Sequence, residues 1–518
     1  MANAWPERTL SLGRRMIMTD ATEITKDNII EIVNAAYATH LTNAAEEIAL
    51  FDYERGKQSI LSREKEVRPE INAKVVVNNA SKIVDTHVGY CFSNPITLVQ
   101  RAKVESGKED SGKDDLRIAL LNKMMHEQAK STKDIELARN LFICGLGYQM
   151  VLPTRKKYKN KMFSPFEILV PNPTTSFVVY SNDAYREPLI GCTYALKEDG
   201  SIILTAYSDK WCYEIRQDKG ETGFRLNKAV TPNVLGIIPI KEFALNDRMG
   251  VFEKAIPILD AINLIDSDRI NDIMQHVQSL LWAHNCDIDT EKKEELRSGG
   301  IIQTKSGGNG YEAKLQYLNQ TLNETEVQKL VDHLIESLEQ ITATPSWKEA
   351  SGGSTTGAMQ LSNGWQCLEI SAKLIEQLFV KPEMDLLDAA IEIIKADERP
   401  YEGLKDIELA DIEIRFCRTK TYDLVSKTNA LVSLINAGVD GLTAFNTVGL
   451  FTDSQQAWLD SSRIINGVQE KLINDQAGNV IKNANAATDE NGRGGEDNTP
   501  KDPTDESFQP SKVAGVTE

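Results

Sequence analysis

The residue types that most often carry catalysis form no recognisable motif in this sequence. Gly145 and Gly147 begin a G-x-G, but Met150 stands where a dinucleotide-binding fingerprint needs its third glycine. No G-x-x-x-x-G-K-[ST] phosphate-binding loop occurs. The run from Gly353 to Gly357 lacks the serine centred between glycines that a nucleophile elbow requires. The sequence therefore contains no motif for a dinucleotide site, a nucleotide-binding loop or a hydrolase nucleophile.

The six histidines do not have the spacing of a metal site. None forms H-E-x-x-H, and His276 and His284 are eight residues apart on an expected helix, whereas two ligands on one face are typically four apart. We expect structural or surface roles for the histidines, no cofactor, no metal and no catalytic residue. An alternative hypothesis is a soluble mixed α/β nucleic-acid-processing enzyme whose functional residues converge from distant parts of the chain.

One stretch combines a charge, an aromatic ring and a flexible backbone. The sequence from Ser346 to Gly357 follows Thr344-Pro345 and is too rich in glycine and serine to pack a core of its own. It carries one aromatic residue, Trp347, and one lysine, Lys348. Such a loop is either an ordinary flexible turn at the surface or a device that presents these side chains to a ligand.

Two predicted helices flank this loop and must position it. The second begins near Ala358 and could continue for about 40 residues, or roughly 60 Å. Pro382 is expected to kink or interrupt it. The first, over residues 324–343, has an apolar stripe with the spacing of a helix, formed by Val327, Leu330, Val331, Leu334, Ile335, Leu338 and Ile341.

Composition limits the possible classes of protein. The 518 residues carry a net charge of −18, whereas proteins that clamp nucleic acid concentrate Lys and Arg against the phosphates. The seven cysteines are scattered and form no C-x-x-C pair, which favours a reducing compartment over a disulfide framework or a zinc site. No apolar run approaches the roughly 18 residues of a membrane span, and the first 15 residues lack the apolar region of a secretory signal.

The remaining segments predict an α+β protein of several domains. Helical periodicity covers residues 26–53, 75–90, 116–144 and 251–285, with Pro257 in the first turn of the last helix. Seven short apolar or alternating runs between Pro, Gly, Asn and Asp predict a mainly antiparallel β region. These runs are residues 148–152, 166–170, 176–180, 189–196, 202–207, 211–215 and 237–243.

Shorter elements complete the expected order. Residues 301–305 and 312–318 can form a hairpin around a glycine-rich turn, after a short helix at 291–297. Residues 411–416 alternate like a strand and residues 421–473 suggest several short helices.

This order of segments resembles the portal, or head-to-tail connector, proteins of tailed bacteriophages, in particular those of long-tailed phages of Gram-positive hosts. Three stretches carry the resemblance, and it extends over roughly residues 26–475. They are NAKVVVNN at 72–79 with its continuation to Pro95-Ile96, GIIPIKEF at 236–243 with Asn246-Asp247 and residues 259–263, and Thr344-Pro345 with STTGA at 354–358.

The resemblance implies a portal fold assembled as a ring. Its parts would be a wing with a helical start and a mainly β region (26–250), a stem helix (251–285), a clip (286–323), a second stem helix (324–343), a tunnel loop (344–357), a long wing helix (358–399) and a helical crown (400–475). The resemblance does not cover the two ends of the chain. From composition we expect a loose N-terminal arm (1–25) and, where apolar residues become rare, a disordered tail (476–518). Large subunit interfaces are expected through both stem helices and the clip hairpin, because repeated heterologous contacts close into rings when the rotation fits.

The resemblance also implies partners and places. Family members form rings, usually of twelve subunits, at one capsid vertex of the virion, and assemble in the host cytoplasm. Double-stranded DNA passes through the ring during packaging and ejection. The terminase large subunit docks first and a head-tail adaptor later, with capsid and scaffolding proteins around the ring and no membrane.

Two sets of site residues follow from the resemblance. The tunnel loop would present Trp347, Lys348, Glu349, Ser351, Gly352, Gly353, Ser354 and Thr355 to DNA. The clip would dock the motor and the adaptor through Glu294, Arg297, Lys305, Asn309, Glu312 and Lys314. The acidic charge fits such a channel, because each phosphate contact adds affinity and a sliding duplex should not be held tightly. Lys348 would touch phosphates transiently, whereas Trp347 could pack at the loop base, on a neighbouring subunit or simply in a core.

Overall fold

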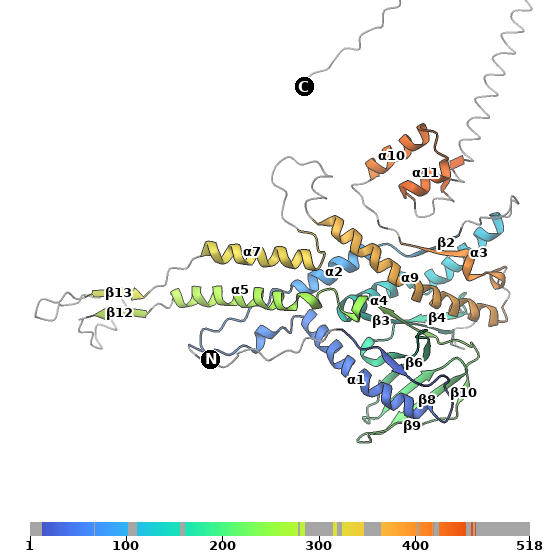
Figure 1. Cartoon of the computed structure of the whole chain (residues 1–518), viewed down its shortest axis with the longest axis horizontal. Helices are drawn as coiled ribbons and strands as arrows, with labels where there is room; N and C mark the ends of the chain where they lie inside the picture. The colour runs from blue at the N-terminus through green and yellow to red at the C-terminus, as the bar shows by residue number, and fades with distance from the viewer. Residues whose placement is uncertain are drawn as a thin grey trace, which may run out of the picture. The chain divides into compact units, whose positions relative to one another are not determined.

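The computed structural model describes residues 13–66, 68–101, 111–155, 161–277, 280–284, 314–318, 324–346, 364–399, 401, 403–416, 418, 424–451, 457–458 and 461–462. The chain forms two compact units, Met1–Tyr422 and Asp423–Glu518, and each is considered by itself. The first unit is a mixture of helices and sheets that includes every predicted strand the structure describes (Figure 1). The α+β fold class is therefore confirmed.

The larger sheet carries most of the predicted β region. Its strands in spatial order are β1 (Ile17–Thr19), β5 (Ser176–Ser181), β6 (Pro188–Leu196), β7 (Ile202–Tyr207), β8 (Trp211–Gln217) and β10 (Thr231–Pro232), and β9 (Arg225–Leu226) also pairs with β8. All described pairs are antiparallel except β1 with β5. Alternate side chains such as Phe177 and Val179 are buried against the first half of α1 (Ile29–Glu54), through residues such as Ile32 and Val33. The period-2 pattern of the sequence thus gives the face that α1 covers.

A second, smaller sheet lies against the first. Its order is β11 (Ile240–Ala244), β3 (Leu146–Pro153) and β4 (Phe166–Leu169). The two sheets approach closely at Gly191, where an added Cβ would lie 2.8 Å from Ile238 Cγ2. The long helix α9 (Trp365–Ala396) packs on β11 and β3. A separate pair joins β2 (Thr97–Gln100) to β14 (Ile412–Arg415).

Helices surround the main core of the first unit. They are the end of α1, α2 (Asn79–Phe92), α4 (Lys130–Cys144), the start of α5 (Ile256–Val277), the end of α7 (Glu324–Ile341) and the first half of α9, whereas α3 (Ser111–Glu127) packs in another core. Aromatic rings fill its centre, and Phe379 lies 5.1 Å from Phe92 and 4.6 Å from Phe243 between ring centroids. The second half of α9 belongs to another core, with Leu386, Ile391 and Ile394 buried against β2, β4 and β14.

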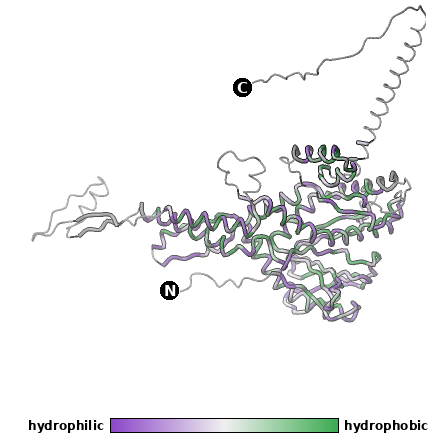
Figure 2. Tube along the Cα trace, turned by 45° about the horizontal axis from the view of Figure 1, so that its top comes forward, coloured by the Kyte–Doolittle hydropathy of each residue, from purple (hydrophilic) through white to green (hydrophobic). Residues whose placement is uncertain are grey.

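The helices α5 and α7 run side by side, and a hairpin of β12 (Leu280–His284) and β13 (Lys314–Leu318) lies at their far ends (Figure 1). Figure 2 shows hydrophobic and hydrophilic residues interleaved along both helices. Among the described residues no helix is long and apolar enough to cross a bilayer. Exposed apolar side chains remain on both helices, including Ile273 on α5 and Leu330 on α7.

Polar side chains hold an extended segment along α5. The backbone N–H groups of Ala73, Val75 and Val77 donate to Asn271, Ser267 and Asn263 at 2.6, 2.9 and 2.8 Å. Four helical residues rise about 6.0 Å, and two extended residues span about 6.6 Å. Because these repeats nearly match, each second residue of the segment meets the next turn of α5. This ladder fixes the line of α5 relative to α2, which begins at Asn79.

Several predictions of element boundaries are wrong. The segment 75–78 is extended rather than helical, since its backbone bonds to α5. The first 25 residues are not simply a loose arm, because β1 joins the large sheet. The stem helix ends at Val277, and residues 280–284 form β12, which pairs with β13. The expected strand 301–305 lies outside the described residues. Pro382 does not interrupt α9, which continues through it.

Other expectations are confirmed. Pro257 occupies the first turn of α5, and residues 412–415 form a strand. The helical run expected over 116–144 forms α3 and α4, which are separated at Ala129, a residue with φ of 50°. The second unit contains the expected short helices, α10 (Leu424–Asn436) and α11 (Gly441–Val448), which bury Leu431 and Phe445 between them. The 3-10 turns are η1 (Ser59–Ser62), η2 (Pro173–Thr175), η3 (Asn246–Arg248), η4 (Glu253–Ala255), η5 (Leu404–Asp406) and η6 (Leu409–Asp411).

A buried cluster of charges joins the large sheet to the base of α5. Arg14 is fully buried and forms ion pairs with Glu46 of α1, at 3.2 Å, and with Glu253 of η4. Glu47 lies beside them, and one of its oxygens is buried without a hydrogen-bond partner among the described residues. Burial raises the pKa of Glu47 to about 7, against the attraction of Arg14 and with the repulsion of Glu242. Ionisation of Glu47 near neutral pH is therefore unfavourable in free energy.

We predict that Glu47→Gln stabilises the protein at pH 8 and has little effect at pH 5. The folded-state pKa of Glu47 lies above its unfolded value, so the stability due to its protonated form is complete at low pH and is lost as the pH rises through about 7. Removing the titration should recover roughly 1–3 kcal/mol at pH 8. Thermal unfolding midpoints at both pH values measure this effect, with Glu31→Gln, at an exposed position of the same helix, as the control. A lower midpoint for Glu47→Gln at pH 8 would contradict it.

Candidate functional site

The two ends of the glycine-rich connection meet at one point of the first unit. The described chain leaves α7 through Pro345 and Ser346 and resumes at Gly364, directly before α9. A Cβ added to Gly364 would lie 3.7 Å from Pro345 Cα and 3.9 Å from the Thr344 carbonyl oxygen. Gly364 also has a φ of 79°, which favours glycine. We call the residues that fix these two ends, 342–345 and 364–369 with their partners, the loop base.

The exit from α7 is a tight, buried turn. Thr342 Oγ1 bonds the Leu338 carbonyl at 2.7 Å and lies 2.9 Å from Thr344 Oγ1. The Thr344 N–H donates to the Glu339 carbonyl at 2.9 Å. Ala343 between the two threonines has a φ of 51°, an uncommon value for a residue with a Cβ. The side-chain hydrogen bonds therefore hold a turn that the backbone alone would not favour.

His87 of α2 anchors this exit. Its Nε2 lies 2.8 Å from the Thr342 carbonyl oxygen. Because that oxygen can only accept, Nε2 must carry the proton. The other ring nitrogen, Nδ1, is buried and has no hydrogen-bond partner in the described part of the chain. Burial lowers the pKa of His87, since a second proton would leave a cation there without an acceptor.

Tyr90, one turn further along α2, anchors the start of α9. Its hydroxyl donates to Glu369 Oε2 at 2.6 Å, and its ring centroid lies 6.0 Å from that of Trp365. His87 and Tyr90 are three residues apart and so share one face of the helix. Two side chains on one face of α2 therefore hold both ends of the connection.

Arg418 contacts the same carboxylate from the other side. Its Nη2 lies 3.3 Å from Glu369 Oε1, and its Nη1 donates to Glu376. The guanidinium carbon lies 5.7 Å from the centre of the Tyr90 ring. Burial raises the pKa of Glu376, and the neighbouring Arg418 opposes this shift. The loop base thus combines one imidazole, one phenol and a guanidinium with two acids, all engaged in holding helices.

Most residues predicted from the resemblance lie outside the described residues. This applies to the eight loop residues Trp347, Lys348, Glu349, Ser351, Gly352, Gly353, Ser354 and Thr355, and to Glu294, Arg297, Lys305, Asn309 and Glu312 of the clip. Lys314 is described as the first residue of β13 and pairs with His284. These predictions remain predictions.

Of the loop base, only Thr344 and Pro345 are singled out by the sequence. The sequence predicts only a structural or surface role for His87 and no role for Tyr90, Glu369 and Arg418. The signal that was available was the spacing of His87 and Tyr90 on one face of a predicted helix. Their partners lie 255 and 279 residues away along the chain, and no local pattern points to them.

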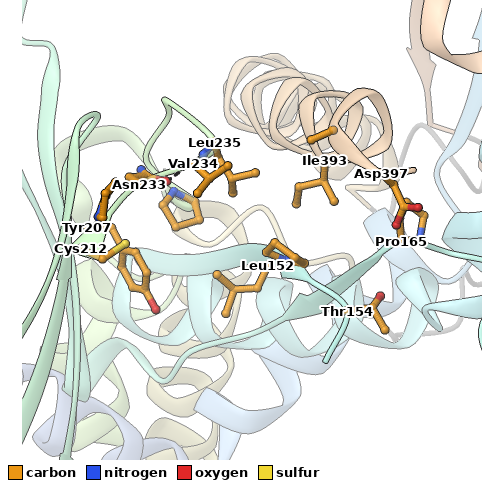
Figure 3. A pocket seen from close by; sticks show the side chains of 14 residues that line it. Leu152, Thr154, Pro165, Tyr207, Cys212, Asn233, Val234, Leu235, Ile393 and Asp397 are labelled. Carbon is orange, nitrogen blue, oxygen red and sulfur yellow. Dashed lines mark hydrogen bonds between the residues drawn. The ribbon is translucent and has the colours of Figure 1, made fainter. Parts of the chain in front are cut away.

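A pocket elsewhere in the first unit is lined by few reactive side chains. It has a volume of about 430 Å³ and lies between β3, the strands β7 and β8, the turn at 232–235 and the end of α9 (Figure 3). Its walls are mostly apolar, with Leu152, Val234, Leu235 and Ile393 around it. The carboxylate of Asp397 at its rim is bonded to Arg399. The lining therefore presents no cluster of reactive groups.

We predict that the loop base loosens as the pH falls, through His87. The folded-state pKa of His87 is depressed, so the stability of its neutral form is complete above about pH 6.5 and is lost as the pH falls through the folded-state value. Hydrogen exchange of residues 338–346, corrected for intrinsic rates, should be faster at pH 5 than at pH 7. In His87→Gln, which keeps a donor but does not titrate, this acceleration should disappear.

His40→Gln is the matched control, because His40 is also buried with a lowered pKa, but bonds the Thr174 carbonyl far from the loop base. Exchange at 338–346 in this variant should retain the pH dependence. An unchanged acceleration in His87→Gln would show that another group controls the loop base.

Comparison with known proteins agrees with this architecture. A family model described as phage portal protein, SPP1 Gp6-like, matches residues 36–440. The match covers more than half of the chain and includes every residue of the loop base. No curated protein matches the chain significantly. The chain therefore belongs to the SPP1 Gp6-like family of phage portal proteins.

Proposed function

We propose that this portal protein forms a closed ring at a unique capsid vertex and that residues 344–357 are the tunnel loop facing the DNA. The family gives the function in outline, which is that of a structural head-tail connector in DNA packaging rather than an enzyme. The observation that supports the loop assignment is the loop base, where Pro345 and Gly364 lie side by side. Contacts with α2 hold both ends of the connection in place. Such a loop can yield to a passing duplex without disturbing the helices below it.

Ring assembly is supported by apolar side chains that one copy of the chain leaves exposed. On the first half of α9, Ile370, Leu374 and Leu378 repeat every four residues and are 54%, 58% and 36% exposed. Further exposed apolar residues lie on α5 and α7, namely Ile270, Ile273, Met274, Leu330 and Ile341. Heterologous contacts between such faces close into a ring when the rotation per subunit fits. Twelve subunits is the number that the resemblance suggests.

The hairpin at the ends of α5 and α7 supports the assignment of residues 286–323 as the clip. The β12–β13 pairing extends over five residues on each strand and gives this end of the two helices a regular edge. Residues between these strands, from Glu294 to Glu312 in the sequence, together with Lys314, would dock the terminase large subunit and later the head-tail adaptor. Capsid and scaffolding proteins would contact the wing and crown, 26–250 and 400–475, with the finished ring in the virion.

The charge of α7 is consistent with a channel that does not hold DNA. Its exposed positions include Glu324, Glu326 and Glu336, whereas Lys329 is its one lysine. Each phosphate contact would release counterions and add affinity. Carboxylates facing a duplex would instead repel it and keep it mobile.

Deleting residues 351–354 should leave ring formation intact and impair DNA packaging. The deletion shortens the connection, and the hydrogen bonds of the loop base do not depend on it. Negative-stain microscopy measures rings, and protection of DNA from nuclease in assembled heads measures packaging. The control is a deletion of the same length at residues 219–222, in the exposed turn between β8 and β9. Failure of assembly in the 351–354 variant alone would show that the loop is a structural strut.

Leu374→Asp should prevent ring closure. The substitution places a charge in the centre of the exposed stripe on α9, where burial against a neighbouring subunit would cost several kcal/mol per contact. Native mass spectrometry should show monomers that remain folded, because Leu374 is 58% exposed in one copy. Leu196→Asp, at a residue that is 71% exposed on β6, is the matched control and should form rings. Rings of Leu374→Asp would exclude this face from the interface.

A further inference from the structure

Four polar side chains meet in the interior between α4, β3 and the middle of α9. Lys130 donates to Asp134 on the same helix and to Glu383 of α9, whose Oε1 lies 2.8 Å from the ammonium nitrogen. These three side chains are only 8%, 3% and 5% exposed. Gln149 of β3 is completely buried and donates to Asp134 Oδ1 at 2.9 Å. Two acids thus share one cation in a place that solvent does not screen.

Three oxygen atoms of this cluster have no hydrogen-bond donor among the described residues. They are Asp134 Oδ2, Glu383 Oε2 and Gln149 Oε1, and all three are buried. Buried polar atoms without a partner are rare in folded proteins, and each calls for an explanation such as a bound water or ion. Because all three atoms are acceptors when both acids are ionised, the missing group must be a donor or a cation.

The charge of the cluster decides what the missing group is. One lysine and two ionised carboxylates would leave a net charge of −1 in the interior, which is strongly unfavourable. A neutral water would not remove this charge. A metal ion such as Ca²⁺ takes about six to eight oxygen ligands, whereas Lys130 already bonds one oxygen of each carboxylate. A proton on one carboxyl removes the charge and turns its hydroxyl into a donor.

Glu383 is the acid that accepts this proton more readily. Asp134 Oδ1 accepts from both Lys130 and Gln149, whereas within the described part of the chain Glu383 accepts only from Lys130. Hydrogen bonds to the ionised form favour that form, so the aspartate is the better stabilised anion. Burial raises the pKa of Glu383, and Asp134 adds to this shift while Lys130 opposes it.

We propose that Glu383 carries a proton at neutral pH, so that the four side chains form a proton-binding site between α4, α9 and β3. The hydroxyl donates to one of the two free acceptors, Asp134 Oδ2 or Gln149 Oε1. Lys130 and Asp134 are the charged groups that act on Glu383, whereas Lys241 of β11 interacts with aspartates further along α9. Loss of the proton at alkaline pH restores the net negative charge and weakens the contact of α4 with α9.

The pH dependence of unfolding in urea reports this proton. The folded-state pKa of Glu383 lies above its unfolded value, so the stability due to its protonated form is complete at low pH and is lost as the pH rises through the folded-state value. Glu383→Gln imitates the protonated form and does not titrate. Between pH 5.5 and pH 7, the unfolding constant of the unaltered protein should rise about tenfold per pH unit relative to that of Glu383→Gln.

Glu392→Gln is the matched control. Glu392 lies on the same helix, but it is 39% exposed and pairs with Lys395. The unfolding constants of the unaltered protein and of this variant should keep the same ratio over the same pH range. A ratio that is also independent of pH for Glu383→Gln would overturn the proposal.

Infrared difference spectra give a second readout, which a merely structural role of Glu383 would not produce. At pH 7 the unaltered protein should show the carbonyl stretch of one protonated carboxyl group that is missing in Glu383→Gln. If that variant does not fold, Asp134→Asn should lose the same band, because Lys130 then has one acid to pair with and Glu383 gives up its proton.

Two infrared results would overturn the assignment. A band that persists in Glu383→Gln and shifts when aspartate is labelled with ¹³C would place the proton on Asp134. Absence of the band, together with a stability that depends on the concentration of sodium or calcium, would show a bound cation in place of the proton.

Discussion

The attachment of both ends of one connection to one face of α2 is the constraint on which the rest of the structure depends. His87 bonds the last turn after α7 and Tyr90 bonds the first turns of α9. These contacts offset the entropic cost of bringing the two ends of the loop together, so the residues between the ends are not needed for closure.

Other parts of the first unit serve to hold α2 and α5 at a fixed relation to the sheets. The ladder of Asn263, Ser267 and Asn271 fixes the segment that leads into α2 on the surface of α5. The cluster around Arg14 joins α1 and the chain before β1 to the turn that begins α5. Both devices use buried polar groups, which have well-defined geometry but are costly when a partner is lost.

The local patterns of the sequence predicted most elements of the fold and little of the site. Alternation between residues 145 and 250 corresponds to β3–β8 and β11, and the 3-and-4 spacing of residues 324–343 corresponds to α7. The helix α9 continues through Pro382 because the residues before and after this proline are buried in cores. Helix propensity alone does not account for such packing. Residues 280–284 form a strand because they pair with residues 314–318. This partner begins thirty residues after His284, so the local pattern does not indicate the pairing. The contact of His87 with Thr342 and that of Tyr90 with Glu369 depend on how α2, α7 and α9 pack, so they could not be predicted from local spacing.

The family match settles the choice between the two hypotheses from the sequence, because portal proteins are structural, and the nucleic-acid-processing enzyme is wrong. The proposed function requires that the loop base faces the central channel of an assembled ring. The most direct test is a cryo-electron microscopy map of the purified assembly at a resolution that shows side chains. Our account predicts a closed ring in which Pro345 and Gly364 of every subunit border the central channel at its narrowest level. A ring that places these two residues on its outer rim, with another segment lining the constriction, would contradict it.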